Sequence, residues 1–158
     1  MPLDATNPVV ALCAEGMAVE GDAPAARALF EKAWDARRDD YDAAVAAHFL
    51  ARHQPTPELT LHWNALAVDH ALRVADGRAQ ELLASLYLNL GDSHRALGHR
   101  REATVAAEQA RVALQELQTG GYRDFVAMGI DRLERRLAEE AVAAADTRLP
   151  SAIRPISD

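Results

Sequence analysis

The chain has a single cysteine, Cys13, and aromatic side chains make up only 5% of its residues. One cysteine cannot form a disulfide within the chain, which favours a reducing compartment. The sequence has no alternating β-branched run typical of strands, and no apolar run near the roughly 18 residues of a membrane span. Its first ten residues lack the basic and apolar regions of a secretory signal. We therefore expect a cytoplasmic protein with no membrane partner.

Positive charge is also scarce. The formal net charge is -7, and Lys32 is the only lysine. An acidic surface of this kind disfavours broad association with phosphate backbones. The arginine clusters, such as Arg100–Arg101, are interleaved with acidic residues as on solvated helix faces. We expect no nucleic-acid partner.

What the chain does have is alanine, which occurs in nearly every block of ten residues. Alanine has the highest helix propensity and allows helices to approach closely. A hydrophobic content of 49% beside 26% charged residues is typical of a folded chain. The composition therefore predicts an all-α fold with a packed core.

Three helix starts can be recognised from local signals. Asn7 precedes Pro8 and Thr56 precedes Pro57, which matches an N-cap residue followed by proline at the first helical position. Asp22 follows a glycine and predicts a third N-cap. With stops such as Gly120–Gly121, these signals divide the chain into about seven helices.

We expect one domain over residues 8–146. It is built of antiparallel helical hairpins and a final helix, between a flexible lead and a flexible tail. The lead covers residues 1–7, the hairpins about 8–36, 41–75 and 78–118, the capping helix about 122–145, and the tail 147–158. The last helix carries Phe125, Ile130, Leu133 and Leu137 at helical spacing. The tail has two prolines and three apolar residues that can dock elsewhere: Leu149, Ile153 and Ile156.

Self-comparison indicates a repeat that is clearest over residues 81–114. Three turns align, at Gly21, Gln54 and Gly98, which lie 33 and 44 residues apart. The longer gap predicts extra helical turns around residues 67–80. Small residues precede each turn by seven positions and follow two of the turns by five, where two helices must touch: Ala14, Ala47, Gly91, Ala26 and Ala103. Larger residues are expected to fill the space between hairpins: Phe30, Trp34 and Trp63.

This pattern resembles the tetratricopeptide repeat, whose unit of about 34 residues has small, aromatic and alanine positions at these offsets. The residues Leu90–Gly91, Gly98, Ala103, Ala107 and Ala110 carry the best match, although the family prefers an aromatic where Ala107 stands. The resemblance covers residues 8–118 and implies hairpins stacked as a short right-handed superhelix with a C-terminal capping helix. The family's proline near the end of each unit is missing from every copy.

The resemblance also implies a concave groove lined by the first helix of each pair. Its candidate partner-binding residues are Glu15, Tyr41, His48, Arg52, Asn89, Asp92 and Arg95, with the apolar neighbours Leu12, Val19, Val45 and Leu88. Such a mixture of polar arms and apolar patches suits a peptide or an extended protein segment. The family's clamp of lysines and asparagines for carboxylates is not reproduced, so chaperone tails are not an expected ligand.

No pattern in the sequence indicates catalysis. The six histidines lack the spacing of three or four residues that a helical zinc pair needs, and there is neither a GxSxG turn nor a glycine-rich phosphate loop. Cys13 stands at a small-residue position between helices and is expected to be a buried small hydrophobic residue. We expect no metal, cofactor or catalytic residues.

The leading hypothesis is a non-enzymatic scaffold that binds a protein or peptide, with a homodimer as a further possibility. One alternative is a small-molecule or metal-binding helical bundle in which His48 and His94 meet Glu15 or Asp92. Another is a regulatory module related to a larger signalling or transcription protein.

Overall fold

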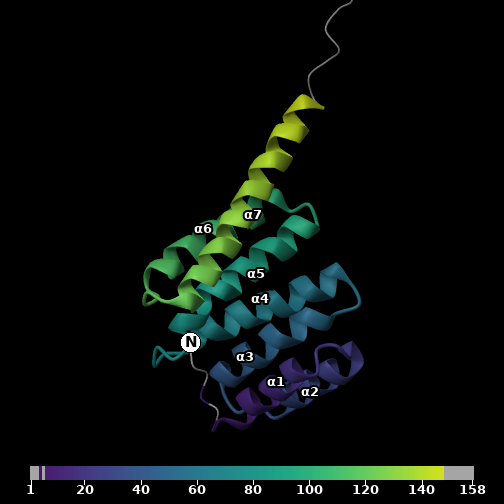
Figure 1. Ribbon diagram of the computed structural model, residues 1–158, viewed down its shortest axis with the longest axis vertical. Helices are drawn as coiled ribbons and strands as arrows, with labels where there is room; N and C mark the ends of the chain where they lie inside the picture. The colour runs from purple at the N-terminus through teal and green to yellow at the C-terminus, as the bar shows by residue number, and fades with distance from the viewer. Residues whose placement is uncertain (1–3, 5, 148–158) are drawn as a thin grey trace, which may run out of the picture.

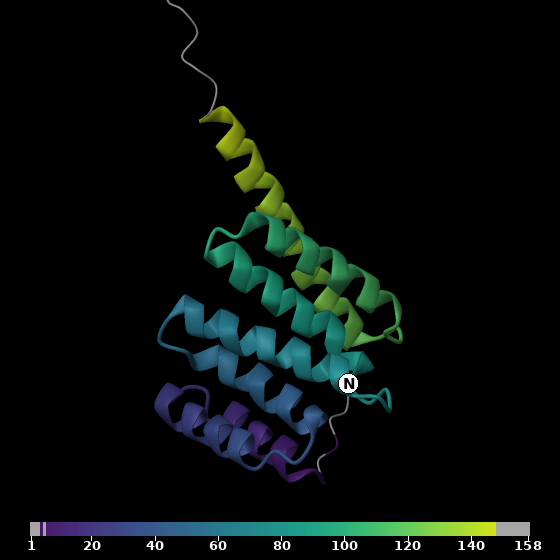
Figure 2. The same cartoon turned by 180° about the vertical axis from the view of Figure 1, so that it is seen from behind.

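The computed structural model describes residue 4 and residues 6–147. Within them the chain forms seven α-helices, packed as sequential antiparallel pairs, and two short 3-10 helices (Figures 1 and 2). The α-helices are α1 (Pro8–Ala18), α2 (Ala23–Asp35), α3 (Asp40–Leu50), α4 (Pro57–Arg73), α5 (Leu83–Ala96), α6 (Arg100–Gln115) and α7 (Gly121–Asp146). The 3-10 helices are η1 (Ala51–His53) and η2 (Gln80–Leu82). The all-α prediction is confirmed. The predicted tail, apart from Thr147, lies outside the described residues, as do four residues of the lead.

The three helix starts predicted from local signals are present. The side chain of Asn7 accepts hydrogen bonds from the backbone N–H groups of Val9 and Val10, with Pro8 at the first helical position. Asp22 caps α2 and Thr56 caps α4 in the same way. Each cap satisfies backbone donors that have no partner inside the helix.

The helices stack in chain order. Helices α1 and α2, α3 and α4, and α5 and α6 form the three hairpins, and α2 packs on α3 as α4 packs on α5. Helix α7 then packs on both α5 and α6, and its last turns project beyond the rest of the molecule (Figure 1). None of the described helices is long and apolar enough to cross a bilayer.

Aromatic side chains fill the contact between the first two hairpins, as predicted. The rings of Trp34 on α2 and Trp63 on α4 meet edge to face, with centroids 4.9 Å apart. Phe30 is fully buried and stacks on Phe49 with centroids 5.5 Å apart. Aromatic pairs in these arrangements add stabilisation beyond their buried area.

Small residues mark the close helix contacts, but one of the predicted positions is wrong. Gly91 lies against α6, where an added Cβ would stand 3.3 Å from the carbonyl oxygen of Ala103. Ala14 is instead exposed, and Gly16 makes the close contact of the first hairpin against the ring of Phe30. The two hairpins differ in the distance between this contact and the turn: Gly16 precedes Gly21 by five residues, and Gly91 precedes Gly98 by seven.

The long sequence interval between the second and third turns does not form all of the extra helical turns that we expect. Helix α4 ends at Arg73, and residues 74–79 form a loop before η2. The predicted extra helical turns across residues 67–80 are therefore correct only as far as Arg73. Gly77 has a φ of 78° in this loop, which lets the chain reverse where other residues would be strained.

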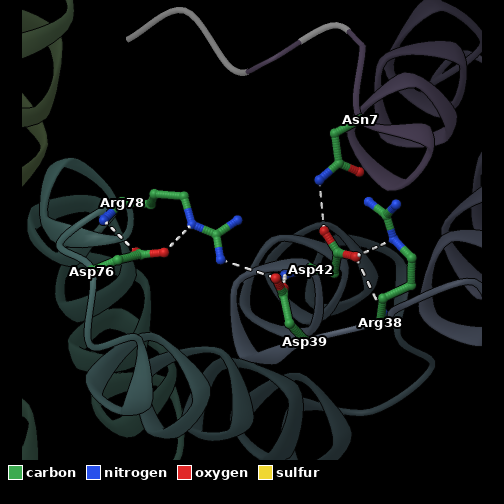
Figure 3. Close-up of polar contacts among 6 residues, drawn as sticks. All are labelled: Asn7, Arg38, Asp39, Asp42, Asp76 and Arg78. Atoms are coloured by element: carbon green, nitrogen blue, oxygen red, sulfur yellow. Dashed lines mark hydrogen bonds and ion pairs between the residues drawn. The ribbon is translucent and has the colours of Figure 1, made fainter.

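A buried polar bridge joins the starts of α1 and α3 (Figure 3). The side-chain amide of Asn7 donates to Oδ1 of Asp42 over 2.6 Å, and the other carboxylate oxygen accepts from the backbone N–H and the Nε of Arg38. Beside it, Arg78 donates to Asp76 and to Asp39, which ties the loop after α4 to the start of α3. Asp42 is 1% exposed, so these partners compensate a carboxylate removed from water.

Candidate binding groove

A groove of about 360 Å³ lies between α3, α5 and the first half of α7. Its walls are mainly apolar, and its polar groups stand among aromatic and aliphatic side chains. It is lined by Val45, His48, Phe49, Arg52, Leu82, Ser85, Leu86, Leu88, Asn89, Tyr122, Phe125, Val126, Met128, Gly129 and Arg132. Clefts of this size with a few convergent polar groups are typical of binding sites.

Several predicted groove residues do meet there. His48 and Arg52 extend from α3 and η1, and Asn89 extends from α5. The side-chain nitrogen of Asn89 lies 3.3 Å from Nδ1 of His48, which bonds the two helices at the groove wall. The apolar neighbours predicted with them, Val45 and Leu88, also line the cavity.

Four other predicted residues lie elsewhere. Tyr41 is 7% exposed, with its ring under the guanidinium of Arg78 at 4.8 Å. Glu15 is exposed on α1 and does not line the groove. Asp92 and Arg95 pair with each other, and Arg95 also donates to Glu140 over 3.0 Å. Their observed role is to hold α7 against α5.

Sequence reasoning missed the wall that α7 contributes. Phe125 is 69% exposed and Met128 59% exposed, and both face the groove with Gly129 and Arg132. The face buried in the core is formed instead by Val126, Ile130, Leu133 and Leu137. The signal was present, because Phe125, Met128 and Arg132 recur at the helical spacing of three and four residues next to the core stripe.

The groove is basic in an acidic protein. Among the residues that the structure describes, its lining includes Arg52 and Arg132 but no aspartate or glutamate, whereas the chain as a whole carries a net charge of -7. Glu20, beyond the cavity, accepts two hydrogen bonds from Arg52 at 2.5 and 3.0 Å. The bond from Arg52 holds the pKa of Glu20 below its ordinary value. Among the described residues, Arg132 has no carboxylate within ion-pair distance.

The histidine in the groove is neutral near pH 7. Burial, reinforced by the positive charge of Arg52, lowers the pKa of His48 to about 4. A neutral imidazole can accept the hydrogen bond that the Asn89 amide offers. His48 therefore adds a polar, uncharged group to the wall, and the positive charge of the groove comes from its arginines.

The side chains singled out for metal binding or reactivity do not come together in the part of the chain that the structure describes. No three histidine, cysteine or acidic side chains gather there in a way that could hold a metal ion. His94 lies at a separate surface with Arg101 and Val105, away from His48. Cys13 is fully buried, as predicted, and burial raises the pKa of its thiol to about 12.

The groove can therefore offer apolar contact, the cationic group of Arg132, a second arginine that is paired with Glu20, and a hydrogen-bonding wall. These features suit the recognition of a molecule that is mostly apolar and carries negative charge. Comparison of the chain with protein families, with curated proteins and with solved structures found no match.

Proposed function

We propose that the protein is a non-enzymatic scaffold whose groove binds a segment of another protein. The hairpins would stack as a short right-handed, tetratricopeptide-like superhelix, with α7 continuing the row of first helices. The groove would then lie on the concave side. The observation that carries the proposal is a pair of large exposed apolar side chains, Phe125 and Met128, at the edge of a cavity whose described lining residues include no acidic group.

The apolar part of the groove would supply most of the affinity. Covering an exposed phenylalanine or methionine is worth about 1.5–3 kcal/mol when the side chain becomes fully buried. Phe125 and Met128 lie one helical turn apart, so a single apolar side chain of the bound segment can contact both. Contiguous exposed apolar surface of this kind is typical of interaction sites.

The charge of the groove would determine which segments bind. Arg132 is exposed at the groove and Arg52 shares its charge with Glu20. An acidic residue beside the apolar anchors of the segment can pair with Arg132 at the rim, while a basic residue there would be repelled. The expected ligand is an amphipathic segment with apolar anchors and at least one carboxylate.

A peptide-display selection tests this proposal. Segments enriched on the wild-type protein should combine apolar anchors with acidic residues, and Met128→Asp or Arg132→Glu should weaken their binding about tenfold, or about 1.4 kcal/mol. Leu72→Asp is the matched control for Met128→Asp, because Leu72 on α4 is also 59% exposed but does not line the groove. Arg101→Glu on α6 serves the same purpose for Arg132→Glu. Equal losses in the groove variants and their controls would refute the proposal.

The cavity volume also supports a second candidate, a small apolar acid. A volume of about 360 Å³ lies near the lower end of the range for small-molecule sites, about 300–1,000 Å³. A thermal-shift series with straight-chain fatty acids of increasing length separates the two. Stabilisation that depends on chain length and disappears in Arg132→Glu would favour the small molecule, and no shift would leave the protein segment as the ligand.

A further inference from the structure

The end of α7 extends from the body of the protein without support (Figures 1 and 2). Among its described residues, Glu140 is the last whose side chain bonds to another helix, through Arg95. Residues 141–147 follow, and all are exposed except the half-buried Ala144. This projecting end is acidic and alanine-rich, with the sequence AVAAADT following Glu139 and Glu140.

One stripe along α7 joins the groove wall to this projecting end. Its residues recur at alternating steps of four and three, which keeps them on one face of a helix. The stripe consists of Phe125, Gly129, Arg132, Arg136, Glu139, Ala143 and Asp146. The first three line the groove, so the same face continues beyond the body of the protein.

Charges of opposite sign are separated along this stripe. Within the stripe, Arg132 and Arg136 precede Glu139 and Asp146, so the basic part comes first along the helix and the acidic part lies nearer the projecting end. Among the residues that the structure places, the nearest carboxylate to Arg136 in an ion pair is Asp92, at a long 3.8 Å. An antiparallel copy of the same helix places the acidic half of each stripe beside the basic half of the other.

We propose that a second copy of this chain docks on the groove through an antiparallel pairing of the two α7 helices. The two-fold axis passes midway between Arg136 and Glu139, so each Arg136 meets Glu139 of the second copy. The same register sets Arg132 opposite Ala143 of the second copy and within one helical turn of its Asp146. Ala143 is small, which leaves room for the long side chain of Arg132 beside it in this register.

This inference rests on the proposed function, because it names an occupant for the same basic groove. The projecting end of α7 has the chemistry that the groove selects, namely an apolar helix with carboxylates. The contact is isologous, because the acidic end of each copy lies against the basic part of the other copy's stripe. It closes on itself and gives a dimer.

Sedimentation equilibrium over a range of protein concentrations tests the pairing. Wild-type protein should form a dimer, and Glu139→Arg or Arg136→Glu alone should raise its dissociation constant about tenfold or more, because both symmetric contacts become repulsive. The double variant Arg136→Glu/Glu139→Arg restores opposite charges across the axis and should return the constant to within about threefold of wild type. Glu108 is an exposed residue of α6, so Glu108→Arg is the matched control and should leave the dimer unchanged. Thermal melting of each variant checks that the fold is intact.

Three results would overturn the pairing. These are a wild-type protein that stays monomeric at every concentration, a double variant that dimerises no better than the single variants, or a dimer lost only when residues 148–158 are deleted. The last result would assign the contact to the tail. The peptides selected for the proposed function should still bind the monomeric Glu139→Arg variant, so failure of the dimer and failure of the groove as a binding site are distinguishable.

Discussion

The contact at Gly91 gives the most direct test of the packing between α5, α6 and α7. A Cβ atom at this position would lie 2.8 Å from Cδ2 of Leu133, 3.3 Å from the carbonyl oxygen of Ala103 and 3.4 Å from Cβ of Ala106. The first of these neighbours is the end of a flexible side chain, but the other two belong to the body of α6. Leucine at position 91 therefore cannot be accommodated without moving a helix.

The cost of Gly91→Leu can be estimated from three contributions. Overpacking costs about 1–3 kcal/mol, and partial loss of the burial of Leu133 adds about 2 kcal/mol. Leucine has a higher helix propensity than glycine, which adds back about 0.8 kcal/mol of stability. The net destabilisation is about 3 kcal/mol, or a decrease in Tm of roughly 6–12 °C for a chain of this size.

Thermal unfolding followed by circular dichroism measures this decrease. Ala96→Leu is the matched control, because Ala96 lies on the same helix but is exposed, and its Tm should change by no more than about 2 °C. Gly91→Ala should fall between the two variants, because only the side chain of Leu133 must move far. If Gly91→Leu melts within about 2 °C of the wild type, the close packing of α5 against α6 and α7 is wrong.

Two further predictions concern buried polar groups. The pKa of His48 is lowered from 6.5 to about 4, so the unfolded chain protonates first as the pH falls below 6.5. This removes about 2 kcal/mol of unfolding free energy between about pH 7.5 and pH 5, and His48→Gln should abolish that part of the pH dependence in urea titrations. If the unfolding free energy of His48→Gln keeps the full pH dependence of the wild type, the lowered pKa of His48 is contradicted. Asn7→Ala removes both the N-cap of α1 and the donor to Asp42, and should cost about 2–3 kcal/mol by urea unfolding. Asn7→Asp keeps the cap but places a second carboxylate beside that of Asp42, so the variant should lose stability at neutral pH and regain it at low pH. Equal stability of Asn7→Asp and wild type at neutral pH would refute the bridge.

The features that the sequence predicted well are local ones. A cap such as Asn7 or Thr56 acts on the next few residues, so neighbouring residues are enough to identify it. Aromatic positions such as Trp34 and Trp63 were also predictable, because a large ring on an amphipathic helix is usually buried. The number and type of the helices follow from these local rules.

The errors arose where the spacing between elements mattered. Gly21 and Gly98 were aligned as equivalent turns, but only Gly98 has a positive φ, of 76°. The close contact of the first hairpin lies at Gly16, five residues before Gly21, whereas Gly91 lies seven residues before Gly98. The loop at residues 74–79 is a similar case, since a sequence gap gives the length of an insertion but not its conformation.

The candidate site was only half predictable, because one of its walls depends on where the last helix packs. His48, Arg52 and Asn89 could be assigned from the repeat, since they stand on the first helices of their pairs. Phe125 and Arg132 could not be assigned in this way, because the sequence does not show whether a final helix covers the end of the stack or continues the row of first helices.

The position of α7 explains why the candidate groove extends beyond the most regular part of the chain, residues 81–114. In the hairpin of α5 and α6, small residues such as Gly91 and Ala103 are required for packing. Helix α7 uses one face for the core and has another free for contact with a partner. Gly129 links the two roles, because a Cβ there would lie 2.5 Å from Cδ2 of Leu88. Without a side chain at this point, α7 approaches α5 closely enough to make Phe125 and Arg132 part of the same groove as Asn89.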